Sequence, residues 1–160
     1  MMKKAIFMVA AILAVFVLVG CKDADSDSGS DSTPQPFTIK VVNLTIPTAG
    51  QVFGASLMEA SNPTTPVAIG IPTDGMGTAT TTFSFYHPAS SGSLPYDADK
   101  PFNTDGQYML GLALTSMAAP NSPVAIYTYM KNSNPVITFD SDNSNYDLNL
   151  TTDFMSLPQM

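Results

Sequence analysis

The stretch Gly106-Gln107-Tyr108-Met109-Leu110-Gly111-Leu112-Ala113-Leu114-Thr115-Ser116 carries the clearest structural pattern in this chain. Large apolar side chains occupy every second position from Tyr108 to Leu114, and Met109, Gly111 and Ala113 stand between them. Alternation with a period of two is typical of a β-strand that turns one face toward a core. The sequence therefore predicts a strand over 106–116 and an all-β fold around it.

Similar patterns occur on both sides of this strand, and Gly, Pro, Asn and Asp residues separate them as turns. The other predicted strands cover 37–46, 51–59, 66–71, 78–86, 124–130, 136–140 and 146–150. In the first of these the apolar phase shifts near Val41, which predicts a bulge. Such a series of short strands predicts a single antiparallel β-sandwich of about 7–9 strands, immunoglobulin-like in size, over residues 37–160.

Two parts of this domain resemble each other. Gly54–Ile69 aligns without gaps on Gly111–Ile126, and both copies read as strand, Pro-bounded loop, strand. A Thr-Phe pair follows each copy, at Thr82-Phe83 and Thr138-Phe139. Two related meanders that face each other across one core are one interpretation, and chance similarity of two hairpins with biased composition is the other.

The N-terminal segment has the pattern of a targeting signal. Lys3 and Lys4 precede an apolar run from Ala5 to Gly20 that ends in Leu18-Val19-Gly20-Cys21. The run is shorter than the roughly 20 residues that a membrane-spanning helix needs. It looks like a bacterial lipoprotein signal, which predicts cleavage of residues 1–20 and acylation of Cys21. An ordinary secretory signal and an uncleaved anchor are the alternatives.

Residues 21–36 then form a segment rich in Asp and Ser, which cannot bury enough apolar surface to order itself and is expected to be a disordered linker. Its acidic start resembles the stretches that send lipoproteins of some Gram-negative groups to the outer face of the outer membrane. The expected location is therefore the cell envelope, with the domain lipid-anchored at the outer membrane and surface-exposed. The membrane is the first predicted partner, through the acyl chains.

Charge and composition exclude several classes of function. The formal net charge is −7, and the chain has no Arg, the usual bidentate partner of phosphate. Nucleic acid is therefore not an expected partner. His87 is the one histidine, Cys21 is the one cysteine, and no motif surrounds any Ser as in serine hydrolases. We expect no enzymatic activity.

Two oxygen-rich stretches are candidate Ca²⁺ ligands, because Ca²⁺ takes 6–8 oxygens from side chains and carbonyls. The first contains Asp140, Asp142, Ser144 and Asp147, and the second contains Asp97, Asp99 and Asp105. The first departs from the EF-hand pattern, with Asn145 in place of the required Gly and Thr151 in place of the bidentate Glu. A pair of Asx turns is the structural alternative.

Tyr127 and Tyr129 are a candidate ligand-binding pair, because they share one face of a predicted strand and aromatic rings stack on sugars and on protein surfaces. If Val124 and Ile126 on the other face form the core, the tyrosines point outward. If the tyrosine face is packed instead, the pair is structural.

The order of strand sequences resembles small all-β modules of lipoproteins and secreted proteins from host-associated bacteria. The segments that carry this resemblance are TIKVVNL (38–44), GASLME (54–59), PVAIGI (66–71), GTATTTFSFY (77–86), PFNTDGQYMLGLAL (101–114), PVAIYTY (123–129) and VITF (136–139). The resemblance implies a β-sandwich surface module without a general assignment of function, and it transfers no functional residues.

Three functions remain as hypotheses. The first is a lipid-anchored, non-enzymatic surface module that binds or adheres to a protein or glycan. The second is a carbohydrate-binding protein with a calcium-dependent loop site. The third is a structural subunit of a surface fibre, in which an unpaired edge strand accepts another chain.

Overall fold

The structure is a computed structural model of the 160-residue chain, and it describes residues 34–44, 48, 50–74, 79–90, 94–116, 118–140, 142 and 145–157. Strands dominate the described part. They are β1 (Thr38–Val42), β2 (Gln51–Glu59), β3 (Asn62–Pro72), β4 (Thr80–Pro88), β5 (Tyr96–Pro101), β6 (Gly106–Ser116), β7 (Ala119–Tyr129), β8 (Val136–Phe139), β9 (Asn145–Asn149) and β10 (Phe154–Leu157). The helix α1 (Leu150–Asp153) joins β9 to β10. The all-β prediction is confirmed.

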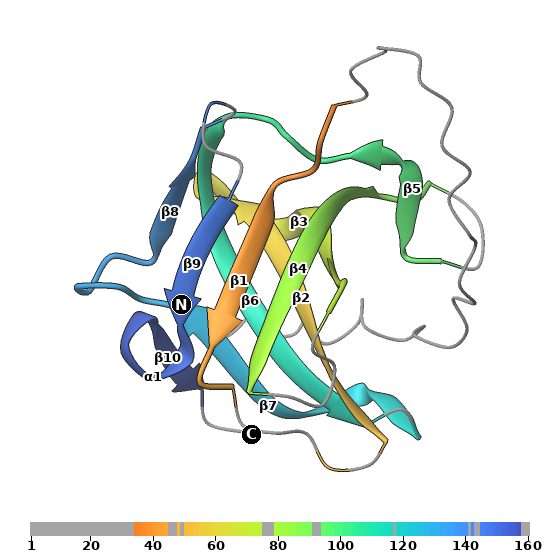
Figure 1. The fold of residues 1–160 in the computed structure, drawn as a ribbon, viewed down its shortest axis with the longest axis vertical. Helices are drawn as coiled ribbons and strands as arrows, with labels where there is room; N and C mark the ends of the chain where they lie inside the picture. The colour runs from red at the N-terminus through yellow and green to blue at the C-terminus, as the bar shows by residue number, and fades with distance from the viewer. Residues whose placement is uncertain are drawn as a thin grey trace.

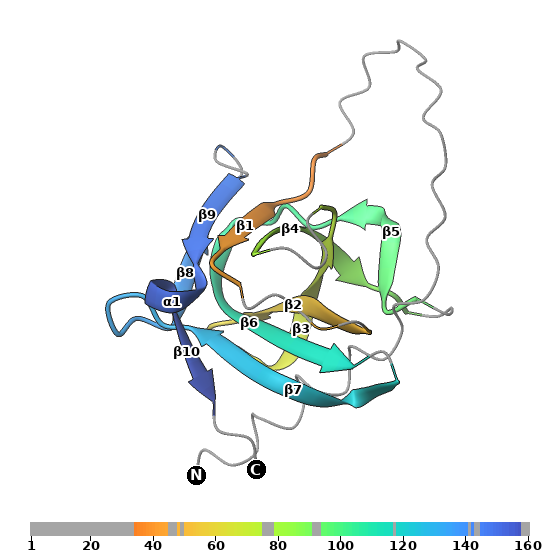
Figure 2. The ribbon, with the colours of Figure 1, turned by 60° about the horizontal axis from the view of Figure 1, so that its bottom comes forward.

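All ten of these strands belong to one hydrogen-bonded sheet that curls around the core as a half-barrel (Figures 1 and 2). The order is β10-β7-β6-β2-β3-β4-β1-β9, with β5 added beside β4 and β8 beside β6. A sandwich of two separate sheets is therefore not confirmed. The prediction of about 7–9 strands is too low, because β5 and β10 lie in sequence without clean alternation.

The prediction of a purely antiparallel sheet is wrong at one edge. β9 runs parallel to β1, with Thr38 opposite Asn145 and Val42 opposite Asn149. A parallel neighbour needs a long crossover connection, and here nearly the whole domain lies between the two strands. Periodicity within one strand contains no information about such a distant partner.

The strand predicted over 106–116 is confirmed residue for residue as β6, and it organises the middle of the sheet. One edge of β6 pairs with β2 along its length, from Tyr108 opposite Glu59 to Ser116 opposite Gln51. The other edge pairs with β8 in its first half and with β7 in its second half. β7 and β8 thus lie end to end along β6, and residues 130–135 leave the sheet between them.

The aligned segments form two hairpins with the same register. In the first hairpin (β2 and β3) Leu57 lies opposite Ala68, and in the second hairpin (β6 and β7) Leu114 lies opposite Ala125. The register then shifts in both hairpins, so that Met58 meets Pro66 and Thr115 meets Pro123. The alignment of Gly54–Ile69 on Gly111–Ile126 therefore reflects a repeated structure.

The arrangement of the two hairpins differs from the interpretation in which they face each other across a core. They lie side by side, because β2 pairs with β6, and Ala55 lies opposite Leu112 in the alignment as well as in the sheet. The third piece is not repeated: β4, with Phe83, lies beside β3, whereas β8, with Phe139, lies beside β6 and not beside β7.

β8 and β9 are not paired as strands in the described sheet. Aromatic packing holds them close together instead. The ring of Phe139 lies 4.6 Å from that of Tyr146 and 4.8 Å from that of Phe37. Phe139 is 1% exposed and Phe37 is fully buried. We conclude that apolar burial rather than a hydrogen-bond ladder joins this side of the half-barrel.

The core fills the concave side of the sheet with residues from alternate positions. Its central side chains are fully buried: Phe37, Ile39, Val41, Leu57, Ala68, Phe83, Phe85, Leu110 and Leu112. Gly70 lies in the middle of this side, where a Cβ would stand 2.7 Å from Ala55 Cβ and 2.8 Å from the Phe85 ring. A glycine is required there because the Phe85 ring lies across its backbone.

Three local features differ from the sequence-based prediction. The phase shift expected near Val41 occurs at Asn43, whose φ of 58° ends β1 and brings Leu44 into the core. Residues 96–101 form β5, although their alternation is weak. Residues 150–157 form α1 and β10, because Asn149 caps a helix of one turn by accepting a hydrogen bond from Thr151 N.

Candidate functional site

The acidic stretch with Asp97, Asp99 and Asp105 lies on β5 and on the connection to β6. The Asp97 carboxylate is held by an ion pair with Lys100 Nζ at 2.9 Å and accepts a hydrogen bond from Asp99 N at 3.2 Å. The hydrogen bond from Lys100 lowers the pKa of Asp97 below its usual value. Its oxygens are therefore already engaged by the protein in an Asx-type turn.

The acidic stretch with Asp140, Asp142, Ser144 and Asp147 follows β8 and enters β9. Asp140 Oδ1 accepts a hydrogen bond from Asp142 N at 2.9 Å, which is the geometry of an Asx turn, and Tyr146 Oη accepts one from Asp140 N at 2.9 Å. Asp147 lies within β9, opposite Lys40 of β1. Ser144 lies outside the described residues.

The two acidic stretches adjoin at one end of the half-barrel. Gly106 pairs with Phe139, so Asp105 and Asp140 are the next positions along β6 and β8. Phe37 N also bonds to Phe102 O, and Thr38 lies opposite Asn145 at the same end. Within the described ranges, however, no three His, Cys, Asp or Glu side chains are grouped as a metal site requires. Calcium binding stays a prediction.

Tyr127 and Tyr129 lie on the concave side of the sheet. Tyr129 is 7% exposed, with its ring 5.9 Å from that of Phe154, and Tyr127 is partly buried, with its ring 6.2 Å from that of Phe53. Burial raises the pKa of the Tyr129 phenol, and the Asp153 carboxylate raises it further. Of the two alternatives for this pair, the structure has the packed one.

The opposite face of the same strand points outward. Val124 is 42% exposed, and Met155 of β10 is 45% exposed beside Thr128 of β7. Ile126 lies between them in the register, half-buried. Ile126, Thr128 and Met155 therefore share the convex side of the sheet, whereas Val124 is the extra residue at the register shift between Leu114 and Thr115 and has no partner in β6.

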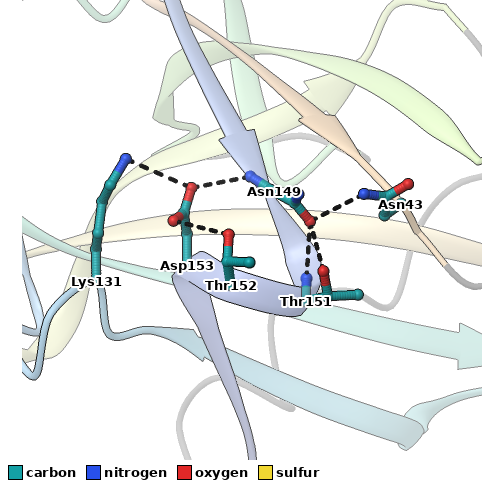
Figure 3. Close-up of polar contacts among 6 residues, drawn as sticks. All are labelled: Asn43, Lys131, Asn149, Thr151, Thr152 and Asp153. Atoms are coloured by element: carbon teal, nitrogen blue, oxygen red, sulfur yellow. Dashed lines mark hydrogen bonds and ion pairs between the residues drawn. The ribbon is translucent and has the colours of Figure 1, made fainter.

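A polar network that the sequence did not predict fastens the C-terminal segment (Figure 3). Asp153 is 6% exposed, and its carboxylate accepts hydrogen bonds from Asn149 N at 3.0 Å and from Thr152 Oγ1 at 3.1 Å. Lys131 Nζ, in the segment that leaves the sheet after β7, lies 3.7 Å from the same carboxylate. The side chain of Asn43 donates to Asn149 Oδ1 at 3.1 Å and ties the end of β1 to the end of β9.

This network is structural in its chemistry. The carboxylate of Asp153 satisfies the backbone N–H of the N-cap residue Asn149, as in a capping box, and it forms an ion pair with Lys131. The signal in the sequence was Asn149 followed four residues later by Asp153, one residue later than the usual capping spacing.

The remaining predicted positions are His87 and Cys21. His87 lies at the end of β4, where its ring contacts the edge of the Phe102 ring at a centroid distance of 5.1 Å. Cys21, the predicted signal peptide 1–20 and most of the linker 21–36 lie outside the described residues. In the part of the chain that the structure describes, no helix has the length and hydropathy to cross a bilayer.

Comparison of the chain with protein-family models, with curated proteins and with solved structures finds no match. The resemblance to β-modules of host-associated bacteria therefore stays a prediction, and function has to be argued from the residues.

Proposed function

We propose that this chain is a lipid-anchored protein of the cell envelope, at the outer membrane, and that its domain is a non-enzymatic surface binding module. Acyl chains on Cys21 tether the protein, the acidic linker separates the domain from the membrane, and the half-barrel presents its convex side to a protein or glycan. Two acyl chains hold a protein durably, whereas one holds it only marginally.

The observation that carries the binding role is the pair of exposed apolar side chains Val124 on β7 and Met155 on β10. Val124 and Met155 are two of the three large apolar residues that are exposed in the described part of the chain; the third is Leu94 at 36%. β10 pairs with β7, and exposed apolar side chains on neighbouring strands are a feature of contact surfaces.

The tether and the binding role are tested separately. Metabolic labelling with an alkyne fatty acid is expected to mark the wild-type chain and to leave the Cys21→Ser variant unmarked; equal labelling of the two would contradict the tether. An array of host-matrix proteins, envelope components and glycans then tests binding. The paired substitutions Val124→Asp and Met155→Asp should abolish the signals, whereas Leu94→Asp, at the third exposed apolar residue, should preserve them.

The second candidate is a calcium-dependent carbohydrate site, favoured by the adjacent positions of Asp105 and Asp140 at one end of the half-barrel. Calorimetric titration of the chain with Ca²⁺ is the test, with Asp140→Asn as the variant. Absence of heat and of a melting shift at millimolar Ca²⁺ would end this proposal.

The fibre hypothesis is favoured by β9 and β10, which stand at the two ends of the sheet order. Size-exclusion chromatography of the chain without acylation tests the fibre hypothesis, because a fibre subunit should elute as oligomers larger than the monomer.

A further inference from the structure

The convex side of the sheet has a different residue composition at its centre. There the outward positions of the two hairpins are occupied by apolar or small residues without charge. We call this surface the central outer face; it consists of Val52, Gly54, Ser56, Met58, Ile69, Met109, Gly111, Ala113 and Thr115. These residues point away from the core, since Phe53, Ala55, Leu57 and Leu112 alternate with them and belong to it.

Most of the central outer face is buried even though it lies outside the core. Ala113 is fully buried, Thr115 is 1% exposed, Ile69 is 2% and Met58 is 6%. The strands of the described part form one sheet, and its one helix contacts β9 and β10. No second layer of described elements therefore stacks on this face.

Ser56 gives a second, independent indication that this face has an occupant. It is 6% exposed, and its Oγ is the one buried side-chain polar atom of the described residues without a hydrogen-bond partner. Its neighbours in the sheet are Ile69 on β3 and Gly111 on β6. A buried hydroxyl without a partner costs about 1–3 kcal/mol, so it is rare unless something outside the described fold meets it.

We propose that the central outer face is a docking surface for the apolar run Ala5–Gly20 of the same chain before cleavage. The run cannot remain exposed in water, because each buried CH₂ is worth about 0.8 kcal/mol. Away from the membrane, the central outer face is the surface that suits it. The unprocessed chain thereby shields the central outer face of its own domain.

Charge and length agree with this occupant. The run from Ala5 to Gly20 contains no charged residue, and neither does the central outer face. The protein as a whole carries a net charge of −7, so an uncharged face is distinct from the rest of the surface. Residues 21–33 separate the run from the described domain, and at about 3.3–3.6 Å per residue they reach across a domain of this size.

The test uses the full unprocessed chain, and its outcome does not depend on whether Cys21 is acylated in cells. Cys21→Ser prevents acylation and removes the one natural thiol. Ser56→Cys then places a single thiol on the central outer face by a nearly isosteric change that breaks no hydrogen bond. A protease site inserted between Asp31 and Ser32 allows the run to be removed from the folded protein.

We expect a maleimide to alkylate the Ser56→Cys thiol at least about tenfold faster after cleavage and dilution than before. The reason is that the run Ala5–Gly20 dissociates from the central outer face and exposes the thiol. The matched control is Val124→Cys in the same background, which is expected to react at the same rate before and after. Equal rates for the Ser56→Cys thiol before and after cleavage would overturn the proposal.

A second measurement keeps the proposal testable if the Ser56→Cys chain does not fold. A photoreactive benzoylphenylalanine in place of Met109 is expected to cross-link to a peptide from residues 5–20 of the same chain. A cross-link between two copies of the chain, or none to residues 5–20, would contradict the assignment. Failure here leaves the tether unaffected, since fatty-acid labelling at Cys21 is measured on its own.

Discussion

The two hairpins of this sheet have the same backbone register but different side-chain contents. At equivalent positions the first hairpin has Ala55 and Gly70 where the second has Leu112 and Tyr127. The difference follows from what lies next to each: Phe85 of β4 lies across Gly70, whereas the second hairpin borders β10 and fills its own part of the core. A repeated register thus fixes strand pairing and bulges, while neighbouring elements decide which side chains fit.

The largest expected effect is at Leu112, which fills the centre of the second hairpin and is fully buried. We expect Leu112→Ala to lower the free energy of unfolding by about 2–5 kcal/mol, because a cavity remains in the core. Chemical denaturation measures the loss, with Val124→Ala as the control, since Val124 is 42% exposed. A loss as small as that of the control would show that the second hairpin accepts an alanine at position 112, as the first hairpin does at the equivalent Ala55.

The first hairpin should fail in the opposite way, by overpacking. Gly70→Ala places a Cβ within 3 Å of Ala55 Cβ and the Phe85 ring, and we expect a loss of about 1–3 kcal/mol. The double variant with Phe85→Leu measures the cause, because a smaller side chain at position 85 relieves the clash and the two losses are then less than additive. Strict additivity would contradict this account.

Ser56 and Ala113 are equivalent in the two hairpins, so Ser56→Ala makes the first hairpin match the second. We expect Ser56→Ala to raise the free energy of unfolding by up to about 1 kcal/mol, because the hydroxyl is buried without a partner. Thr115→Val is the control and should lower the free energy of unfolding. Thr115 Oγ1 donates a hydrogen bond to Val52 O at 3.5 Å, and the substitution removes this bond. Urea denaturation of both variants measures the difference.

The smallest expected effect is a dependence on alkaline pH that belongs to the second hairpin alone. Burial raises the pKa of Tyr108 on β6 and of Tyr129 on β7 above the ordinary value. An unfolded chain loses these phenolic protons at lower pH than the folded chain, so stability is complete below pH about 10 and falls as the pH rises above it. Tyr129→Phe should make the fall less steep.

Spectrophotometric titration at 295 nm, where ionised phenols absorb, checks whether Tyr108 and Tyr129 have a raised pKa in the folded chain. A slope that is the same in the Tyr129→Phe variant and in the wild type would contradict the role of Tyr129.

Local alternation predicted most of the strands because it depends on neighbouring residues alone. It located β6 from Tyr108 to Leu114, the start of β2 and the repeated hairpins. It missed β5 because Asp97, Asp99 and Lys100 interrupt the pattern there. It could not give the parallel pairing of β1 with β9, because that depends on which edge of the sheet the last strands reach.

The candidate site was less predictable than the fold. Whether Tyr127 and Tyr129 or Val124 and Ile126 face the core depends on which side of β7 the sheet curls toward, and alternation is the same in both cases. The unpaired Ser56 hydroxyl is equally invisible in sequence, since a serine between Ala55 and Leu57 reads as an ordinary outward residue. The acidic stretches were recognised as Asx turns or calcium ligands, and their turn geometry is what the structure has.

The contact of β1 with β9 has a consequence for how the protein is made. The hydrogen bond from Thr38 to Asn145 joins residues 107 positions apart, so the first strand of the described fold lacks this neighbour until almost the whole chain has been synthesised. Proteins dominated by such distant contacts fold slowly. We therefore expect refolding on the timescale of milliseconds to seconds, and a chain that ends before β9 should leave the ribosome or the export machinery with an open, aggregation-prone edge at β1.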